Sequence, residues 1–533
     1  MNRLKDILLL KKNLLGTIFF MFSVIYFFSG IFYGLDYSDT FYHLNHAIQP
    51  PNEIHSYTFL LSSILIKFFI EISGYELIML RFINSLLFFF SIICPFVLLK
   101  TKQPKVEVLF YISCILILMA PLNFNVLGYD TLSIFILAII FSVLILYIKK
   151  SNTYLLVILA ILSSAAILIR LPNILLIPIV LLIILGKEGN SLLKITSYGI
   201  KFAFLYLLLT MLFIFLGYYI YYEEWNVFRS STLISHNAKN LIYSYLRDGI
   251  KLIFFISFLL ASYFLFNYFR KIKYKFLLYG AFIVLHLLLL YKFVLFTAYS
   301  WNYSLYLTSI VLSIIVIHSY YNRKNSGEFA QLVLYLYFLF LFINPFGSDT
   351  GFLKAASLLL LFPFILSLID LKLEKFWFLI LITLLPLSIL QKASVIYEDF
   401  KITDLNKTLD INLLYPIRTN EFRYRHLKNI DKEVKELHEK DVKVFFYGNN
   451  SHIFHYLYPN NSLNISSFRQ PVDTLLFLPD IEKVLLKKDK SALFLVKSYP
   501  EHKSKEDVSL LEVELLKRGF EKIEHNSLIY YLR

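Results

Sequence analysis

Long apolar runs of about 20 residues recur along this chain from Leu14 to about Leu390. Wound as an α-helix, a run of that length crosses a hydrocarbon core about 30 Å thick. Because 58% of the residues are hydrophobic and only 17% are charged, an ordinary water-soluble domain of this length is excluded. The sequence therefore predicts a polytopic α-helical membrane protein.

The apolar runs predict about thirteen transmembrane helices, with centres near residues 25, 89, 114, 140, 161, 178, 210, 260, 286, 310, 336, 361 and 383. The first run, from about Gly16 to Gly34, lacks a small-residue cleavage site and is interpreted as a retained span. The stretch 154–186 is broken by Arg170 and Pro172. We interpret it as two short spans that meet at an outer turn, because proline lacks a backbone donor and arginine is expensive at mid-membrane. A single kinked helix would invert the topology downstream.

Basic residues concentrate in the loops that alternate along the chain, and this asymmetry predicts the orientation. With the N-terminus, the loops assigned to the inside hold about twenty Lys or Arg, against about nine on the outside before residue 392. The N-terminus is therefore expected in the cytoplasm and the C-terminal tail outside, in a multi-pass protein of the cell (inner) membrane. Abundant Lys, Ile, Asn, Phe and Tyr suggest a bacterial source. The formal charge of +15 is explained by membrane orientation better than by nucleic-acid binding, so we expect no nucleic-acid partner.

Two domains are expected, a transmembrane domain over 1–391 and a small extracytoplasmic α/β domain over 392–533. The outer loop 36–80 includes an apolar stretch, 57–72, that carries Lys67 and Glu71 and is short for a crossing, so we expect an amphipathic interfacial helix there. In the tail, 442–447, 492–496 and 527–532 are strand-like, and 505–517 is helix-like. Only Cys94 and Cys114 are present, both in apolar segments, which suggests neither a disulfide framework nor a cysteine metal site.

Candidate functional residues gather on the face predicted to be outer. Asp36, Asp39 and His43 follow the first span, Asp130 opens the fourth, and Arg170, His236 and Asp349 lie in later outer segments. Each also has a purely structural interpretation. An acid beside a span can be a solvated flank or a helix cap, a basic side chain can extend to lipid headgroups, and Asp349 lies in a turn rich in Gly and Pro.

Three short motifs occur in order along residues 14–220. The first is Asp39-Thr40-Phe41-Tyr42 after the first span, the second is Gly74-Tyr75 leading to Arg81-Phe82-Ile83-Asn84, and the third is Gly128-Tyr129-Asp130-Thr131-Leu132, followed by Ile169-Arg170-Leu171-Pro172. With them the chain resembles the polytopic glycosyltransferases of the C superfamily, particularly the dolichyl-phosphate-mannose protein mannosyltransferase and aminoarabinose transferase-like group. That group commonly has Asp-Glu in the first motif. This chain has Asp39-Thr40, so the partner acid must come from elsewhere, for which Asp36 is a candidate.

The resemblance implies a hexosyl- or pentosyltransferase that moves a sugar from a polyprenyl-phosphate donor to a lipid, glycan or protein acceptor at the outer membrane face. Asp39 would be the general base, with Asp36 or Asp130 orienting the acceptor or a metal. A cation must meet the charge that develops on the leaving phosphate, and the candidates are Arg81, Arg170, Arg247, Lys292 and Lys354. Some relatives hold a divalent ion with a carboxylate and a histidine, a role for which Asp39 and His236 are candidates.

Two other classes of protein remain as alternatives. A polysaccharide polymerase or ligase is also a multispan enzyme, but such proteins resemble one another through arginine-rich outer loops late in the chain, whereas the motifs here are early and acidic. A lipid-linked glycan transporter or flippase is expected to carry charges near the bilayer midplane and internal repeats. The predicted spans are almost free of charge at their centres, and we find no repeat. The transferase requires Asp36, Asp39, Asp130 and a basic side chain to converge.

Overall fold

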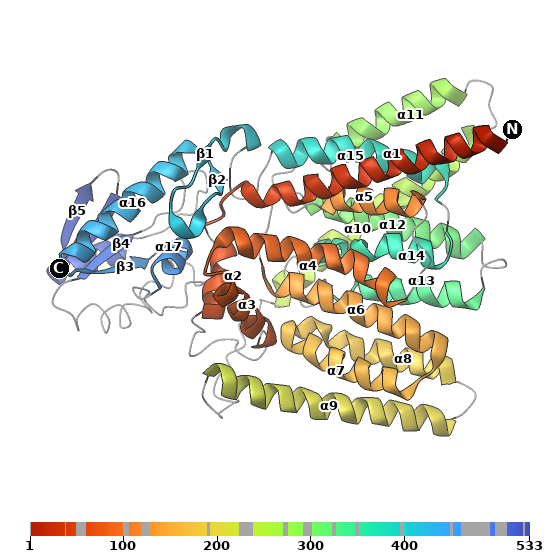
Figure 1. The fold of residues 1–533 in the computed structure, drawn as a ribbon, viewed down its shortest axis with the longest axis horizontal. Coiled ribbons are helices and arrows are strands. Elements are labelled where there is room, and N and C mark those ends of the chain that lie inside the picture. The colour runs from red at the N-terminus through yellow and green to blue at the C-terminus, as the bar shows by residue number, and fades with distance from the viewer. Residues whose placement is uncertain are drawn as a thin grey trace.

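The computed structural model describes most of the chain, and all structural statements refer to that part. It comprises residues 2–37, 39–48, 60–99, 106–119, 127–188, 192–222, 238–269, 275–291, 301–321, 327–346, 351–371, 373–394, 399, 401–447, 451–459, 491–495, 509–525 and 528–532. Figure 1 shows a bundle of roughly aligned helices, with a smaller region of helices and strands at one end.

In the described part of the chain, seven helices are long and apolar enough to cross a membrane. They are α1 (Asn2–Ser29), α4 (Leu77–Leu98), α6 (Tyr129–Lys150), α9 (Leu192–Tyr222), α10 (Ala238–Phe269), α12 (Trp301–Tyr321) and α15 (Lys375–Ser394). The polytopic helical architecture predicted from the apolar runs is thereby supported by length and composition. Of these seven helices α6 is the most enclosed, with 83% of its apolar stretch buried.

The remaining predicted spans fall on shorter apolar segments. These are α5 (Val106–Met119), α7 (Thr153–Ile169), α8 (Leu176–Glu188), α11 (Lys275–Leu290), α13 (Glu328–Leu341) and the 3-10 helix η5 (Gly351–Leu361), which continues into α14 (Phe362–Leu368). Each of the thirteen predicted centres lies in a helical segment, but within the described ranges only seven segments have the length of a crossing. The number of spans therefore stays a prediction.

The predicted break at Arg170 is present. Arg170 has an extended backbone, with φ −158° and ψ 124°, and it ends α7. A short 3-10 helix, η3 (Leu171–Leu175), then leads into α8, with Pro172 in its first turn, where no backbone donor is needed. Asn173 bonds back to the carbonyl of Ala166, at 2.8 Å, which closes the turn. A single continuous helix over 154–186 is thus ruled out.

The segment predicted as an outer loop contains two helices, α2 (Asp39–Ile48) and α3 (Leu60–Ile72). The helix expected over 57–72 is therefore present as α3, where Ser62, Ser63, Ile66 and Ile70 are buried. Helix α3 packs on α2, α7 and α9. Its placement in a membrane interface stays a prediction.

Helix α5 ends inside the bundle, where its last carbonyls need donors from elsewhere. The ammonium of Lys392, a buried residue of α15, donates to the carbonyls of Ile117 and Leu118, both at 2.8 Å. A cation at a helix C-terminus also interacts favourably with the helix dipole. Lys392 therefore satisfies two backbone carbonyl groups at the end of α5, which apolar side chains could not do.

The tail forms the predicted α/β region. A four-stranded sheet has the order β3-β4-β6-β5, in which β3 (Lys443–Tyr447) and β4 (Ser491–Leu495) are parallel and β6 (Leu528–Leu532) is antiparallel to both β4 and β5 (Glu521–His525). The strands β3, β4 and β6 and the helix α19 (Ser509–Lys517) confirm the sequence patterns. Two short strands, β1 (Lys407–Thr408) and β2 (Arg418–Thr419), form a separate antiparallel pair.

The sequence pattern missed the longest helix of the tail, α16 (Glu421–Glu439). The helix begins where the side chain of Asn420 accepts the amide of Arg423, at 2.9 Å, which is an N-cap. Its buried apolar stripe consists of Leu427, Ile430, Val434 and Leu437, spaced three or four residues apart among charged residues. The spacing is a helix signal, but the strongly polar composition conceals it.

Gly351 begins η5 with φ +59°, a left-handed conformation that favours glycine. A Cβ atom there would lie 2.5 Å from Oδ2 of Asp248, a buried residue of α10, and 3.3 Å from the carbonyl oxygen of Ser244. The close approach of η5 to α10 therefore depends on the missing side chain. Helix α10 and η5 also pack through Gly249 and Phe352.

Gly351→Ala is expected to destabilise the protein by about 1–3 kcal/mol, because it adds backbone strain and a steric overlap. Gly280→Ala is the control, because a Cβ atom at this helical position meets nothing within 4 Å and alanine favours helix. Thermal unfolding of the purified protein in detergent measures both variants. Equal melting temperatures would contradict the packing described here.

Candidate active site

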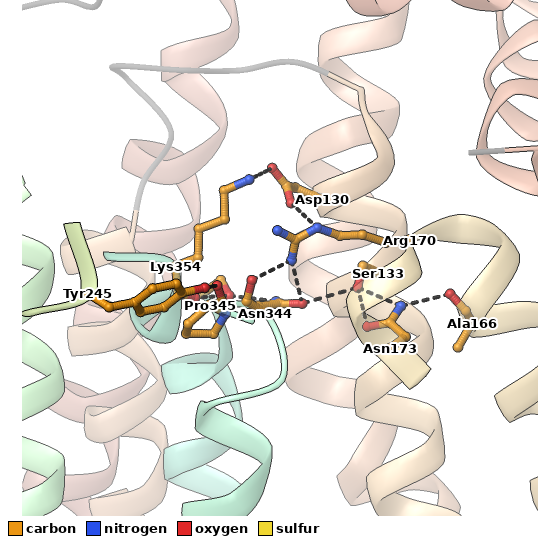
Figure 2. Close-up of polar contacts among 10 residues, drawn as sticks. Asp130, Ser133, Ala166, Arg170, Asn173, Tyr245, Asn344, Pro345 and Lys354 are labelled. Carbon is orange, nitrogen blue, oxygen red and sulfur yellow. Dashed lines mark hydrogen bonds and ion pairs between the residues drawn. The ribbon is translucent and has the colours of Figure 1, made fainter. Parts of the chain in front are cut away.

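Asp130, in the first turn of α6, lies between two basic side chains from distant parts of the chain (Figure 2). Its Oδ1 is 3.3 Å from Nε of Arg170, and its Oδ2 accepts a hydrogen bond from Nζ of Lys354 at 2.9 Å. Arg170 follows α7, and Lys354 lies in η5. We call Asp130, Arg170 and Lys354 the charged cluster. Three residues predicted as site residues are thus brought together.

A polar network beneath the charged cluster holds Arg170 in place. Its Nη1 donates to the backbone carbonyl of Asn344 at 2.7 Å and to the side-chain oxygen of the same residue at 3.2 Å. Ser133 joins Asn344 and Asn173, with contacts of 3.2 Å to each amide oxygen. The amide nitrogen of Asn344 donates to Ser357, at 2.7 Å. Buried polar groups that are hydrogen-bonded in this way hold a specific geometry.

The cluster is more exposed on one side than on the other. The Arg170 side chain is 4% exposed, whereas those of Lys354 and Asp130 are 23% and 37% exposed. Two cations share one carboxylate, so the cluster carries an excess positive charge. Figure 2 shows Asp130 and Lys354 at the edge of the network and the asparagines farther in. The more accessible of the two basic side chains is therefore Lys354, and Arg170 is the buried one.

An aromatic ring and an imidazole border the cluster. The Arg170 guanidinium and the Lys354 ammonium lie 5.8 Å and 5.4 Å from the centre of the Tyr129 ring, within the range of a cation–π interaction. Tyr129 also makes an edge-to-face contact with His43 of α2, with ring centres 5.0 Å apart. Gly128 lies directly beside this imidazole, since a Cβ atom there would be 3.8 Å from it. Helix α2 therefore reaches the charged cluster through His43.

The environment of His43 favours the neutral imidazole. Burial lowers the pKa of His43 to about 4, and Asp130 and Asp36 oppose that shift while Lys354 adds to it. Burial likewise lowers the pKa of His452 in the tail to about 4, against an opposing effect of Asp36. Asp36 and Asp130 thus both act electrostatically on His43.

Asp36 and Arg81 hold the chain between α1 and α2. Oδ2 of Asp36 accepts the amide of Thr40 at 2.7 Å, one of the first-turn amides that have no partner within α2. The Arg81 guanidinium donates to the carbonyls of Ile31, Tyr33 and Gly34, at 3.1, 3.4 and 2.8 Å. The Asp36 contact matches the helix-cap interpretation of an acid beside a span. Whether Arg81 also binds phosphate stays a prediction.

The remaining predicted site residues are placed only in part. Arg247 of α10 pairs with its neighbour Asp248, at 2.9 Å, outside the charged cluster. Asp39 is the first residue of α2, but its side chain lies outside the described part. His236, Lys292 and Asp349 also lie outside the described residues. The described residues contain no group of three His, Cys, Asp or Glu side chains that could hold a metal, so a divalent metal with Asp39 and His236 stays a prediction.

Several residues of the network were not predicted from the sequence. Three of them are polar residues at helix ends or in a helix, beside predicted site residues: Asn344, Asn173 and Ser133. The sequence signal that could have identified them is their polar character in apolar surroundings. Tyr129 precedes Asp130 in the third motif, and the motif by itself predicts a role for Asp130 alone. No protein-family model matches the chain, and no curated protein matches it significantly. The resemblance to the C superfamily therefore stays a prediction from the motifs.

Asp130→Asn is expected to lower the free energy of unfolding by about 1–3 kcal/mol, because the buried Arg170 would lose its carboxylate. The larger loss of stability that follows from breaking a fully buried ion pair is not expected, because the Asp130 side chain is 37% exposed. Asp410→Asn is the matched control, because the Asp410–Lys428 pair on the tail is exposed and contributes less than about 1 kcal/mol. Denaturation in mixed micelles compares the variants, and equal losses would contradict this interpretation.

Stability is expected to fall as the pH drops from about 6.5 towards 4, because the folded protein keeps His43 and His452 neutral while the unfolded chain protonates them. Above about pH 6.5 this contribution is fully present. His452→Asn should flatten the slope of melting temperature against pH in this window. His438→Asn, on the exposed face of α16, serves as the control and should keep the wild-type slope. A His452→Asn slope equal to wild type would contradict the assignment.

Proposed function

We propose that the protein is a membrane glycosyltransferase that moves a sugar from a polyprenyl-phosphate donor to an acceptor hydroxyl at the outer membrane face. The observation that carries the proposal is the convergence of Arg170 and Lys354 on Asp130, 3.3 and 2.9 Å from its carboxylate oxygens. This cluster lies beside α2, which begins at Asp39, the residue that matches the acid of the family's first motif. The proposal is supported by two cations beside the helix that begins at the candidate base.

The charged cluster is suited to the donor phosphate. Arginine and lysine both donate charge-assisted hydrogen bonds to phosphate oxygens, and they stabilise the negative charge that develops as the phosphate leaves. Asp130 keeps the two side chains together before the donor binds, and its shared carboxylate leaves one positive charge in excess. We therefore assign Asp130 to positioning the cations. This differs from the role of orienting the acceptor that the resemblance implies.

The proposed reaction needs one proton acceptor. The acceptor oxygen attacks the anomeric carbon, the bond from that carbon to the phosphate oxygen breaks, and polyprenyl phosphate leaves with the electron pair. Asp39 takes the proton of the attacking hydroxyl as the general base. Asp36 is less suited to that step, because its Oδ2 accepts the Thr40 amide at 2.7 Å. No step of this proposal passes through a metal.

Asp39→Asn is expected to lower turnover by about 10²–10⁴-fold, the usual contribution of a general base, while the protein stays folded. The assay follows transfer of labelled sugar from a panel of undecaprenyl-phosphate-linked sugars to a lipid extract of bacterial envelopes. Unchanged turnover would remove Asp39 as the base. No transfer by the wild-type protein from any donor in the panel would contradict the reaction class.

Lys354→Gln in the same assay is expected to lower kcat/KM for the donor by about 10–100-fold, because a charge-assisted hydrogen bond to phosphate is lost. Lys428→Gln is the control, since Lys428 forms an exposed pair on the tail. Equal kcat/KM values for the two variants would place the phosphate elsewhere.

A further inference from the structure

A buried carboxylate of the tail holds the chain between α1 and α2. The Asp399 side chain is fully buried, with 0% exposed, and it faces four donors. Oδ2 accepts hydrogen bonds from the backbone amide of Leu35 at 2.9 Å and from the hydroxyl of Thr419 at 3.0 Å. Oδ1 accepts one from the side-chain Nδ2 of Asn420 at 2.8 Å, and the Arg423 guanidinium is 3.8 Å from Oδ2. Leu35 lies 364 positions before Asp399, so this contact joins the first span to the tail.

Further contacts of this segment come from the same part of the tail. Arg423 donates to the carbonyl of Leu35 and stacks over the ring of Tyr37, 5.0 Å from its centre. The amide of Gly34 donates to the carbonyl of Arg418 in β2, at 3.0 Å. We call residues 34–37 the connecting segment. It has no regular secondary structure, so its backbone groups need partners. The tail supplies partners to Gly34 and Leu35, and Arg81 of α4 supplies a donor to the carbonyl of Gly34.

The tail also packs directly on α2. The contacts come from α17 (His452–Leu457). Asn45 of α2 donates to the carbonyl of His452 at 2.7 Å, and the ring centres of Phe41 in α2 and Tyr456 in α17 are 5.3 Å apart. The hydroxyl of Tyr456 donates to the carbonyl of Tyr75, just before α4, at 2.6 Å. Figure 1 shows α17 and β2 at the end of the bundle where α2 and α3 lie. Both ends of α2 are therefore held by the tail.

We propose that the C-terminal domain is a structural part of the active site and that Asp399 and Arg423 are positioning residues for α2. A path of contacts leads from Asp399 to Leu35, along α2 to His43, and from His43 to Tyr129 beside the charged cluster. Arg170 and Lys354 themselves are held by contacts with Asp130, and Arg170 also bonds to Asn344; these residues belong to the helical bundle. Loosening the tail therefore displaces α2, with Asp39, and leaves the phosphate-binding cations in place. This inference rests on the proposed function for its kinetic consequences only.

The first test is hydrogen exchange of the full-length protein, which does not depend on the reaction. Asp399→Asn puts an amide donor where all neighbours donate, and it should raise exchange in residues 33–48 about tenfold or more. Residues 153–188, around Arg170, should exchange as in the wild type. Asp410→Asn, which breaks an exposed pair with Lys428 of α16, is the control. Unchanged exchange in 33–48 in folded Asp399→Asn overturns the inference.

A milder variant covers the case in which Asp399→Asn does not fold. Tyr456→Phe removes only the hydroxyl that bonds to Tyr75 and keeps the ring contact with Phe41. Exchange in 39–48 should rise about threefold to tenfold, as expected for loss of one hydrogen bond. Wild-type exchange in this variant, with a native melting profile, would count against a clamp on α2.

The second test separates positioning from donor binding. Arg423→Gln should lower kcat about tenfold or more and leave the KM for the donor within about twofold, because a small displacement of a base lowers the rate without touching the cations. Arg423→Lys, which keeps a charge and a donor, should recover part of kcat. A raised KM with unchanged kcat would overturn the inference in favour of donor binding by the tail. If wild type transfers no sugar, the proposed function fails while the exchange result still decides the inference.

Discussion

The guanidinium of Arg170 must be neutralised and hydrogen-bonded, because it is 4% exposed at the end of a helix in a largely apolar bundle. A buried charge without a partner is strongly destabilising. The partners come from α6, which supplies Asp130, and from the segment after α13, which supplies Asn344. Lys354 of η5 then shares the same carboxylate. One buried cation thus brings three distant segments of the chain to one end of the bundle.

Backbone polar groups between α1 and α2, at the same end of the bundle, also need hydrogen-bond partners. The connecting segment is irregular, so its backbone groups cannot be satisfied within a helix. Arg81 from α4 supplies donors to the carbonyls on one side, and Asp399 and Arg423 from the tail supply partners on the other. The tail is therefore attached through hydrogen bonds to the backbone, in addition to ring contacts. His43 and Tyr129 connect this region with the charged cluster.

The two regions suggest a division of labour among the acids. Asp130 organises cations, and Asp36 satisfies an amide at the start of α2. Asp39 is left as the acid proposed to act on the acceptor, on a helix that the tail holds in place. The roles given to Asp130 and Asp36 follow from what each of these carboxylates contacts, since an acid engaged by strong donors is a weaker base.

Composition and hydropathy were sufficient to predict a helical bundle, the break at Arg170 and the strands β3, β4 and β6, because these features depend on local periodicity and on proline. The motifs also pointed to Asp130 and Arg170. The choice of Lys354 from five candidate cations, the asparagine network and the role of Asp399 came from the folded chain. The contacts Arg170–Asn344, Asp130–Lys354 and Leu35–Asp399 join residues 174, 224 and 364 positions apart, and no local pattern encodes which buried donor meets which acceptor. That pairing is set by the packing of the helices, because a polar group in an apolar interior must find its partner wherever the fold places one.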